Sequence, residues 1–159
     1  TADFFTSVEK DVDFTWIYYG WDGIAAELRN MDLNFIKLQD LDPNLDFYTP
    51  VIIAHEELLE KEPDLARRFL KATAKGYQYA IEYPVEAAQC LLNNVPELDE
   101  ELVIASQKYL AKEYQADAPR WGEMKEEIWS NYANWMRERG LIDKPFYAKE
   151  AFTNEFLPE

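Results

Sequence analysis

The residues best suited to chemistry form a short aromatic turn, Tyr18-Tyr19-Gly20-Trp21-Asp22. The turn follows a β-rich run and precedes an apolar helical segment. This predicts a strand-to-helix junction, where α/β proteins bind small molecules. The rings can stack on a planar heterocycle, and the Asp22 carboxylate can accept paired hydrogen bonds from a ring N–H and an exocyclic amine. An aminopyrimidine suits this arrangement. Alternatively, Tyr18, Tyr19 and Trp21 pack as core and Asp22 only caps its helix.

A second candidate pair, Tyr48 and Thr49, precedes Pro50 at the start of another predicted strand. Proline there suits an edge strand or a point where the chain leaves one sheet for another. Tyr48 and Thr49 are therefore predicted to line a cleft. An ordinary edge strand with a half-buried tyrosine accounts for the same residues.

Other kinds of site are not supported by the sequence. The run His55-Glu56-Glu57-Leu58-Leu59 resembles a zinc-protease helix, but Leu59 stands where the second histidine is needed, and the chain has no other histidine. His55 is interpreted as a helix-start residue without a triad partner. The five glycines are scattered, so no phosphate loop is predicted. We predict no catalytic residue, no metal site and no cofactor.

Composition narrows the partner classes. The 159 residues include 16 basic and 31 acidic side chains, a net charge of −15 that disfavours nucleic acid and anionic lipid. The acidic residues are spread along the chain, as on solvated helix faces. Cys90 is the only cysteine, which excludes an internal disulfide, and we expect it in the core. No apolar run is long enough for a membrane helix.

The hydrophobic pattern predicts a mixed α/β start and a helical remainder. Extended runs are expected at 12–19, 32–38 and 47–53, with a helix at 21–28 between the first two. Further helices are predicted from Pro63, from Pro84, after an Asp99 cap and from Pro119 to just before Gly140. A stripe with helical spacing is interpreted as a packing surface, with Trp121 also a weak cleft candidate: Trp121, Met124, Ile128, Tyr132 and Trp135.

Three short strands cannot bury a sheet by themselves, so the mixed segment is predicted to be part of a larger sheet. The missing strands would come from further residues of the same protein, from a partner chain or from a domain swap. Because the sequence starts at Thr1 and not at methionine, we expect a processed or truncated product.

Two segments carry a family resemblance: Val12 to Ile24, which contains the aromatic turn, and Phe47 to Ala54. They resemble the second half of ABC-transporter solute-binding proteins of the thiamine-precursor (ThiY-like) group. Later segments agree in order with that group's C-terminal helices: 63–72, 75–77, 84–88 and 121–124. These helical segments are also shared with nitrate-, sulfonate- and taurine-binding relatives, so only the first 50 residues indicate a pyrimidine.

The resemblance implies a periplasmic-binding-protein type 2 fold, with two α/β lobes around a cleft. Residues 1–46 would belong to the second lobe, 47–55 would be a crossover strand in the hinge, and 56–159 would be helices packed on the first lobe. It also implies that Tyr18, Tyr19 and Trp21 stack on the ligand and that Asp22 anchors it. Family members often have glutamate at the Asp22 position, so the carboxylate here would lie about 1.5 Å further back.

The resemblance further implies a non-enzymatic solute-binding component of an ABC importer. Its ligand would be a hydroxymethylpyrimidine or a formylaminopyrimidine. Its partners would be permease subunits and the missing N-terminal half or a second copy, at an extracytoplasmic, periplasmic or lipid-anchored location. The alternatives are a binding protein for another solute such as a sulfonate, a helical interaction module, and an enzyme like the thiamine-pyrimidine synthases. Those synthases use a cysteine-rich segment, which this chain lacks.

Overall fold

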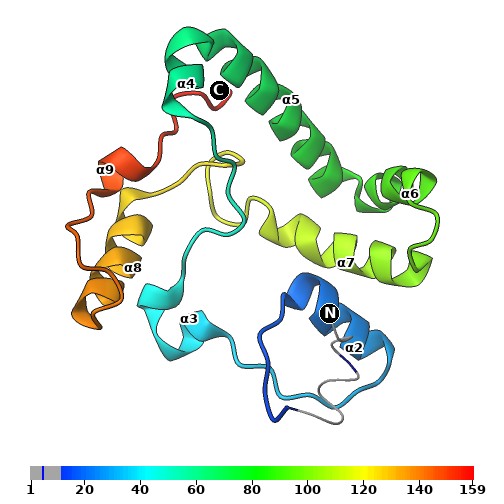
Figure 1. Ribbon diagram of the computed structural model, residues 1–159. Helices are drawn as coiled ribbons and strands as arrows, with labels where there is room; N and C mark the ends of the chain where they lie inside the picture. The colour runs from blue at the N-terminus through cyan, green and yellow to red at the C-terminus, as the bar shows by residue number, and fades with distance from the viewer. Residues whose placement is uncertain (1–4, 6–11) are drawn as a thin grey trace. The chain divides into compact units, whose positions relative to one another are not determined.

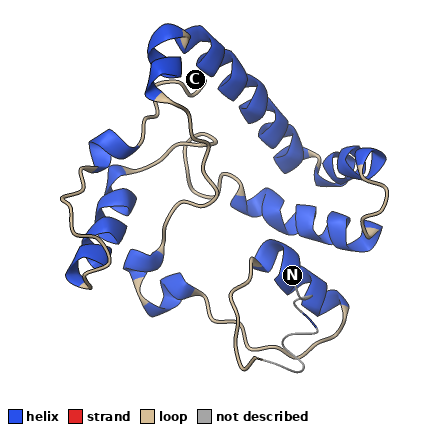
Figure 2. Ribbon diagram, in the orientation of Figure 1, coloured by secondary structure: helices blue, strands red, loops and turns tan. Residues whose placement is uncertain are grey.

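The computed structural model describes residue 5 and residues 12–159, and this part of the chain is helical (Figures 1 and 2). In chain order the elements are the π-helical turn η1 (Tyr19–Gly23), α2 (Ile24–Leu28), α3 (Leu38–Leu41), the 3₁₀ turn η2 (Pro43–Leu45), α4 (Glu56–Lys61), α5 (Pro63–Glu82), α6 (Pro84–Asn94), α7 (Glu100–Glu113), α8 (Glu126–Glu138) and α9 (Ala148–Ala151). None of these helices combines the length and the apolar character that a membrane span requires.

The chain folds as two compact units. The first contains the described residues up to Asn34 together with Gln78–Ala116. The second contains Phe35–Tyr77 and Asp117–Glu159. The aromatic turn belongs to the first unit, whereas Tyr48 and Thr49 belong to the second.

The three predicted strands are not confirmed, because the structure shows no strand in residues 12–159. The backbone at Tyr18, Lys37 and His55 is nevertheless extended, with ψ angles of 110°, 123° and 139°. A local sequence pattern can favour an extended backbone, but a strand also requires a neighbouring chain segment that pairs with its N–H and C=O groups. Within the described residues no segment supplies that ladder.

Several predicted helix boundaries are confirmed. Pro63 and Pro84 begin α5 and α6, as expected for residues with a fixed φ and no N–H to satisfy. The Asp99 carboxylate caps α7 by accepting a hydrogen bond from the Leu102 N–H at 2.8 Å. His55 caps α4 with its Nδ1 atom, which accepts from the Glu57 N–H at 3.2 Å. Gly140, with φ of 69°, follows α8 in a left-handed conformation.

The predicted helix start at Pro119 is wrong, because α8 begins only at Glu126. Gly122 interrupts the helical path with φ of 83°. Met124 is tied to the C-terminal segment instead: its N–H donates to the Asn154 Oδ1 at 3.0 Å, and its carbonyl accepts from the Asn154 Nδ2 at 2.7 Å. A tertiary hydrogen-bond pair thus replaces the helical bonds that the proline pattern predicted.

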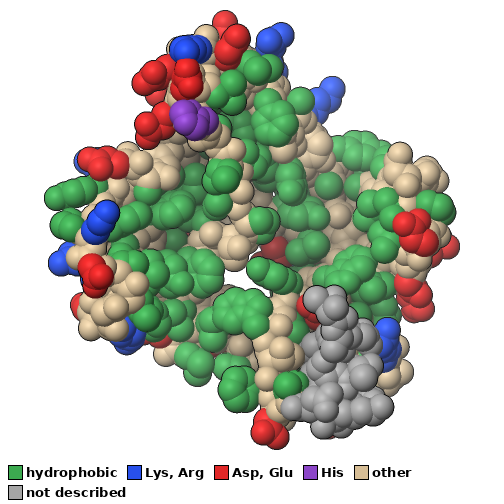
Figure 3. All heavy atoms as spheres, in the orientation of Figure 1, with side chains coloured by type: hydrophobic (Ala, Val, Ile, Leu, Met, Phe, Trp, Pro, Cys, Tyr) green, Lys and Arg blue, Asp and Glu red, His purple; other side chains and the backbone are tan. Residues whose placement is uncertain are grey.

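The core of the first unit lies between α6 and α7. Ala88, Leu92 and Val103 are buried there, with Leu98 and Ile104 packed against them. Cys90, expected in the core, is exposed. It lies two residues from both Ala88 and Leu92 on α6, and so about 200° round the helix from each of them. Hydrophobic side chains also cover much of the visible surface (Figure 3). Leu65 and Phe69 of α5 are among the exposed large apolar residues.

Candidate functional site

The aromatic turn, Tyr18–Asp22, is closed by hydrogen bonds that converge on Tyr18. The Tyr18 carbonyl accepts from the N–H groups of both Trp21 and Asp22, each at 3.0 Å. The Asp22 Oδ2 in turn accepts from the Tyr18 N–H at 3.3 Å. The turn is thus a single π-helical loop that runs directly into α2, and π-helical turns are frequent at functional sites. The predicted strand-to-helix junction is in fact an extended segment followed by this turn.

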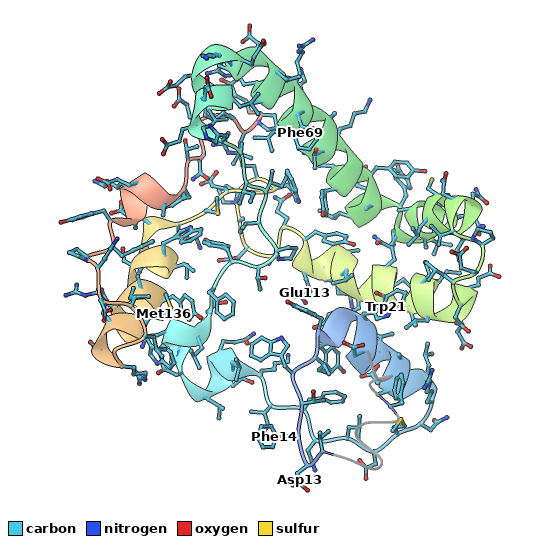
Figure 4. All side chains as sticks on the ribbon, in the orientation of Figure 1. Asp13, Phe14, Trp21, Phe69, Glu113 and Met136 are labelled. Carbon is cyan, nitrogen blue, oxygen red and sulfur yellow. The ribbon has the colours of Figure 1, made fainter. Side chains whose placement is uncertain are left out.

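Two of the three aromatic side chains face solvent. Tyr18 is 61% exposed and Trp21 is 38% exposed, although both belong to types that usually bury most of their surface. Trp21, the middle residue of η1, is labelled in Figure 4. The Asp22 carboxylate is half-buried beside them, and its Oδ1 accepts no hydrogen bond within the described residues. The turn therefore offers two rings and one carboxylate oxygen to a ligand.

Tyr19 has different surroundings. Its hydroxyl donates a hydrogen bond to the Glu27 Oε1, and its ring lies 5.2 Å from the ring of Tyr109 on α7. The hydrogen bond to Glu27, together with burial and the Glu27 charge, raises the pKa of Tyr19 to about 12. Gly23 faces this ring so closely that a Cβ there would lie 2.6 Å from the Tyr19 Cδ2. Tyr19 is therefore half-buried and packs against Tyr109.

Helix α7 packs against the aromatic turn at Gly20. The hydroxyl of Ser106, a residue only 3% exposed, donates to the Gly20 carbonyl. Gly20 lies so close to α7 that a Cβ would stand 2.6 Å from the Leu110 Cδ2. Sequence reasoning missed Ser106, Glu27 and Tyr109. A buried serine on the face that carries Val103 and Leu110, at i, i+3 and i+7, was the available signal.

The second predicted pair, Tyr48 and Thr49, lies in a different environment. The Tyr48 hydroxyl accepts a hydrogen bond from the Lys125 N–H at 2.8 Å, and its ring lies 6.3 Å from the ring of Trp129. Thr49 is exposed and precedes a cis peptide bond to Pro50. Because these residues and the aromatic turn lie in different units, a common site stays a prediction.

Tyr48 joins a set of aromatic residues around α8 that we name the aromatic array: Phe47, Tyr48, Trp129, Tyr132, Trp135, Phe146 and Phe152. Trp129 is stacked on Phe152 at 5.8 Å, and Tyr132 on Phe47 at 4.6 Å. Of the predicted stripe, Ile128, Tyr132 and Trp135 lie on α8, and the contacts of Tyr132 and Trp135 are consistent with a packing role. Trp121 and Met124 precede the helix, so the five residues do not share one helix face. The indole N–H of Trp129 is buried and has no hydrogen-bond acceptor within the described residues.

Asp42 binds the array at Trp135. Its carboxylate accepts from the Asn44 N–H at 3.0 Å and from the Trp135 Nε1 at 2.8 Å, and these two bonds lower the pKa of Asp42. The Arg139 guanidinium lies 4.1 Å from the centre of the Trp135 ring. Trp121, the weak cleft candidate, is stacked on Tyr77 at 4.6 Å. The tryptophans of this unit are thus engaged in packing.

An open depression of about 560 Å³ lies elsewhere in the first unit. It is lined by Ile81, Pro84, Lys108, Ala111, Lys112, Gln115 and Ala116. It contains none of the predicted site residues. Within the described residues, no three His, Cys, Asp or Glu side chains come together as a metal site.

Three curated proteins with related sequences bind or make small heterocycles. The riboflavin-binding protein RibY of Chloroflexus aurantiacus is 29% identical over 117 residues, 67% of this chain and 32% of that protein. The formylaminopyrimidine-binding protein of Halalkalibacterium halodurans is 27% identical over 108 residues, 65% of this chain and 33% of that protein. The 4-amino-5-hydroxymethyl-2-methylpyrimidine phosphate synthase of Legionella pneumophila is 27% identical over 106 residues, 65% of this chain and 31% of that protein.

The chain thus spans about a third of the length of the curated relatives it matches. The relatives include both binding proteins and synthases. The family model described as NMT1/THI5 like matches residues 1–87, more than half of the chain, including the aromatic turn and Tyr48. The resemblance that the sequence suggested is confirmed at this level: the chain belongs to the NMT1/THI5-like family.

Proposed function

We propose that this chain contributes one wall of a binding site for a thiamine-type pyrimidine precursor, in the solute-binding component of an ABC importer. The observation that carries the proposal is the exposed pair Tyr18 and Trp21 beside the Asp22 carboxylate. Two aromatic faces can hold a flat ring, and a carboxylate oxygen can accept a charge-assisted hydrogen bond from an aminopyrimidine. The relatives that bind formylaminopyrimidine and riboflavin support a flat heterocycle as the ligand class.

The proposal extends to all six predicted contacts, with different roles. Tyr18 and Trp21 stack on the ligand, and Asp22 accepts a hydrogen bond from it. Tyr19 supports the turn through the hydrogen bond of its hydroxyl to Glu27. Only part of the Tyr19 ring is therefore left for contact with the ligand. Tyr48 and Thr49 remain proposed as cleft-lining contacts, and Thr49 is exposed.

The proposed architecture is the two-lobed fold of periplasmic binding proteins of type 2. Residues 1–46 would belong to the second lobe, 47–55 would pair as the crossover strand once the missing segments are present, and 56–159 would be helices on the first lobe. The exposure of Phe14 (90%) and Ile53 (87%) supports this arrangement, because large apolar side chains in two extended segments have no covering partner within the described residues. The missing half of the protein, or a second copy, would complete the sheet. The complete protein would act outside the cytoplasm, in the periplasm or on a lipid anchor, and deliver its ligand to permease subunits.

A second candidate function is pyrimidine synthesis. One specific observation favours it: several related proteins, from Legionella pneumophila and Saccharomyces cerevisiae, are 4-amino-5-hydroxymethyl-2-methylpyrimidine phosphate synthases. Within this chain, His55 is engaged as the cap of α4, and Cys90 is exposed on α6. The binding function therefore accounts better for the residues of this chain.

The test is calorimetry on the intact protein that contains this sequence. The ligands are 4-amino-5-hydroxymethyl-2-methylpyrimidine, its formylated amine, thiamine, riboflavin and taurine. We expect heat with a pyrimidine and none with taurine. Absence of heat with every pyrimidine would contradict the ligand class.

Asp22 allows a sharper form of this test. Asp22→Ala removes both the ligand acceptor and the bond from the Tyr18 N–H, and we expect it to weaken pyrimidine binding by about 1.5 to 3 kcal/mol. Asp22→Asn is the matched control, since its amide oxygen still accepts from the Tyr18 N–H while the charge is lost. If Asp22 binds the ligand through its charge, the asparagine variant also binds weakly. If Asp22 only closes the turn, Asp22→Asn binds like the wild type.

A further inference from the structure

Helix α7 is a rigid support within the first unit. One of its faces packs on α6 through Val103, and Asp99 caps its first turn. The Gln107 side chain donates a hydrogen bond to the Ala80 carbonyl at 3.0 Å, which also ties α7 to the end of α5. These contacts anchor α7 independently of the aromatic turn.

A side-chain hydrogen bond links this support to the turn. Ser106 is the only buried polar residue of the described part of the chain, and its hydroxyl donates to the Gly20 carbonyl. The bond joins residues 86 positions apart in sequence, and its donor, Ser106, is buried. Removing the donor loses this long-range hydrogen bond, so the bond favours the observed position of the turn.

Gly20 makes this approach possible. Any larger residue would carry a Cβ at 2.6 Å from the Leu110 Cδ2 and 3.1 Å from its Cγ, well inside contact distance. Ser106 and Leu110 lie one turn apart on α7 and both meet Gly20. The carbonyl and the Cα of Gly20 are therefore both held against the same stripe of α7.

We propose that Ser106 is a positioning residue for ligand binding: its hydroxyl, with Gly20 seated against Leu110, holds the aromatic turn on α7 so that Tyr18, Trp21 and Asp22 face the ligand together. This inference rests on the proposed binding function. Gly20 lies between Tyr18 and Trp21, so a shift of its carbonyl moves both rings and the Asp22 carboxylate relative to one another. A preorganised turn spares the ligand the entropic cost of ordering these groups.

The first experiment compares Ser106→Ala with Gln107→Ala in the intact protein. Both variants remove side-chain hydrogen bonds from neighbouring positions on α7, and of the two residues only Ser106 bonds to the turn. Gln107→Ala removes the bonds to the Ala80 carbonyl and from the Tyr114 hydroxyl. The probe is 4-amino-5-hydroxymethyl-2-methylpyrimidine, measured by calorimetry. We expect Ser106→Ala to weaken binding about three- to tenfold and Gln107→Ala to leave it within about twofold. Equal affinities for wild type and Ser106→Ala would overturn the positioning role, whereas no binding by the wild type would contradict the proposed function alone.

A ligand-free measurement separates the two proposals. In Ser106→Ala the amide protons of Trp21 and Asp22 should exchange with solvent at least several-fold faster than in Gln107→Ala. The reason is that Ser106→Ala breaks the bond between α7 and the turn, whereas Gln107→Ala leaves that bond in place. If both variants raise exchange equally, Ser106 is merely a stabilising core residue and the positioning inference is wrong.

A geometric rescue provides an independent check. Gly20→Ala should also weaken binding and speed exchange at the turn, because its Cβ pushes the turn away from Leu110. Shortening the opposing side chain in the double variant Gly20→Ala with Leu110→Ala makes room and should restore both quantities at least in part. A double variant that behaves no better than Gly20→Ala would contradict the close-approach geometry.

Discussion

In the aromatic array every ring packs on another ring, whereas in the aromatic turn two of the three rings face solvent. Trp129 of the array has stacked or tilted contacts with Tyr48, Phe146 and Phe152. Trp21 of the turn is 38% exposed. The two regions have similar composition, so aromatic content alone does not distinguish a packing surface from a recognition surface. The two regions differ in whether the aromatic rings pack on one another.

The polar groups differ in the same way. In the array, the Asp42 carboxylate is occupied by Asn44 and Trp135, and the Tyr48 hydroxyl accepts from the Lys125 backbone. In the turn, Asp22 uses one oxygen to bind the Tyr18 N–H at 3.3 Å and offers the other. The array therefore holds its own segments together, while the turn keeps hydrogen-bonding capacity for a ligand.

The largest expected effect comes from removing the centre of the array. Trp129→Ala should lower the free energy of unfolding by about 3 kcal/mol, because it deletes a ring that packs on three others. Urea unfolding measures the change. Tyr147→Ala, at a side chain 63% exposed, is the matched control and should change stability by less than about 0.5 kcal/mol. Similar losses for the two variants would remove the distinction between packed and unpacked rings.

Trp129→Phe sharpens this comparison. The substitution keeps an aromatic ring in the stack and removes the indole N–H, which is buried without a hydrogen-bond acceptor within the described residues. Since leaving a buried donor unsatisfied costs about 1 to 3 kcal/mol, this variant should lose less than half of what Trp129→Ala loses. A loss as large as that of the alanine variant would show that the donor has a partner in the folded protein.

In the aromatic turn, a substitution should change ligand affinity more than the free energy of unfolding. Trp21→Ala should weaken binding of the pyrimidine by about 1 to 2 kcal/mol, since a stacking surface is lost, while the unfolding free energy changes by less than about 1 kcal/mol. Calorimetry and urea unfolding measure the two quantities separately. Trp21→Phe should retain most of the affinity. A variant that unfolds more easily but binds as before would assign Trp21 to the core.

The smallest expected effect concerns the Tyr19 phenol. Its pKa, raised to about 12 by the bond to Glu27, lies above the ordinary value of about 10. The folded state therefore favours the protonated phenol. This contribution to stability is complete below about pH 10 and is lost as the pH rises from about 10 to 12. Glu27→Gln should lower the Tyr19 pKa, seen as earlier tyrosinate absorbance in an ultraviolet titration. Identical titration curves for the two proteins would contradict the Tyr19–Glu27 contact.

Local sequence rules predicted the helices well and the strands poorly. Proline at the first position of α5 and α6 and the Asp99 cap of α7 act within one turn of the chain, so they can be read from neighbouring residues. The helix start predicted at Pro119 is wrong for a tertiary reason: Asn154 binds the backbone of Met124, thirty residues away. The strand pattern at 12–19 predicted an extended backbone, but pairing depends on segments that a single stretch of sequence does not contain.

The candidate site shows the same division. The sequence by itself determined the residue types of the aromatic turn, its position before α2, and membership of a family with heterocycle-binding relatives. Only the tertiary structure decided which rings of the turn pack against other residues and which face solvent. Tyr19 bonds to Glu27 and packs on Tyr109, whereas Tyr18 and Trp21 face solvent. It also decided that Ser106 of α7 holds the Gly20 carbonyl. Burial and long-range hydrogen bonds depend on which segments meet in space, and residue order along the chain does not specify that.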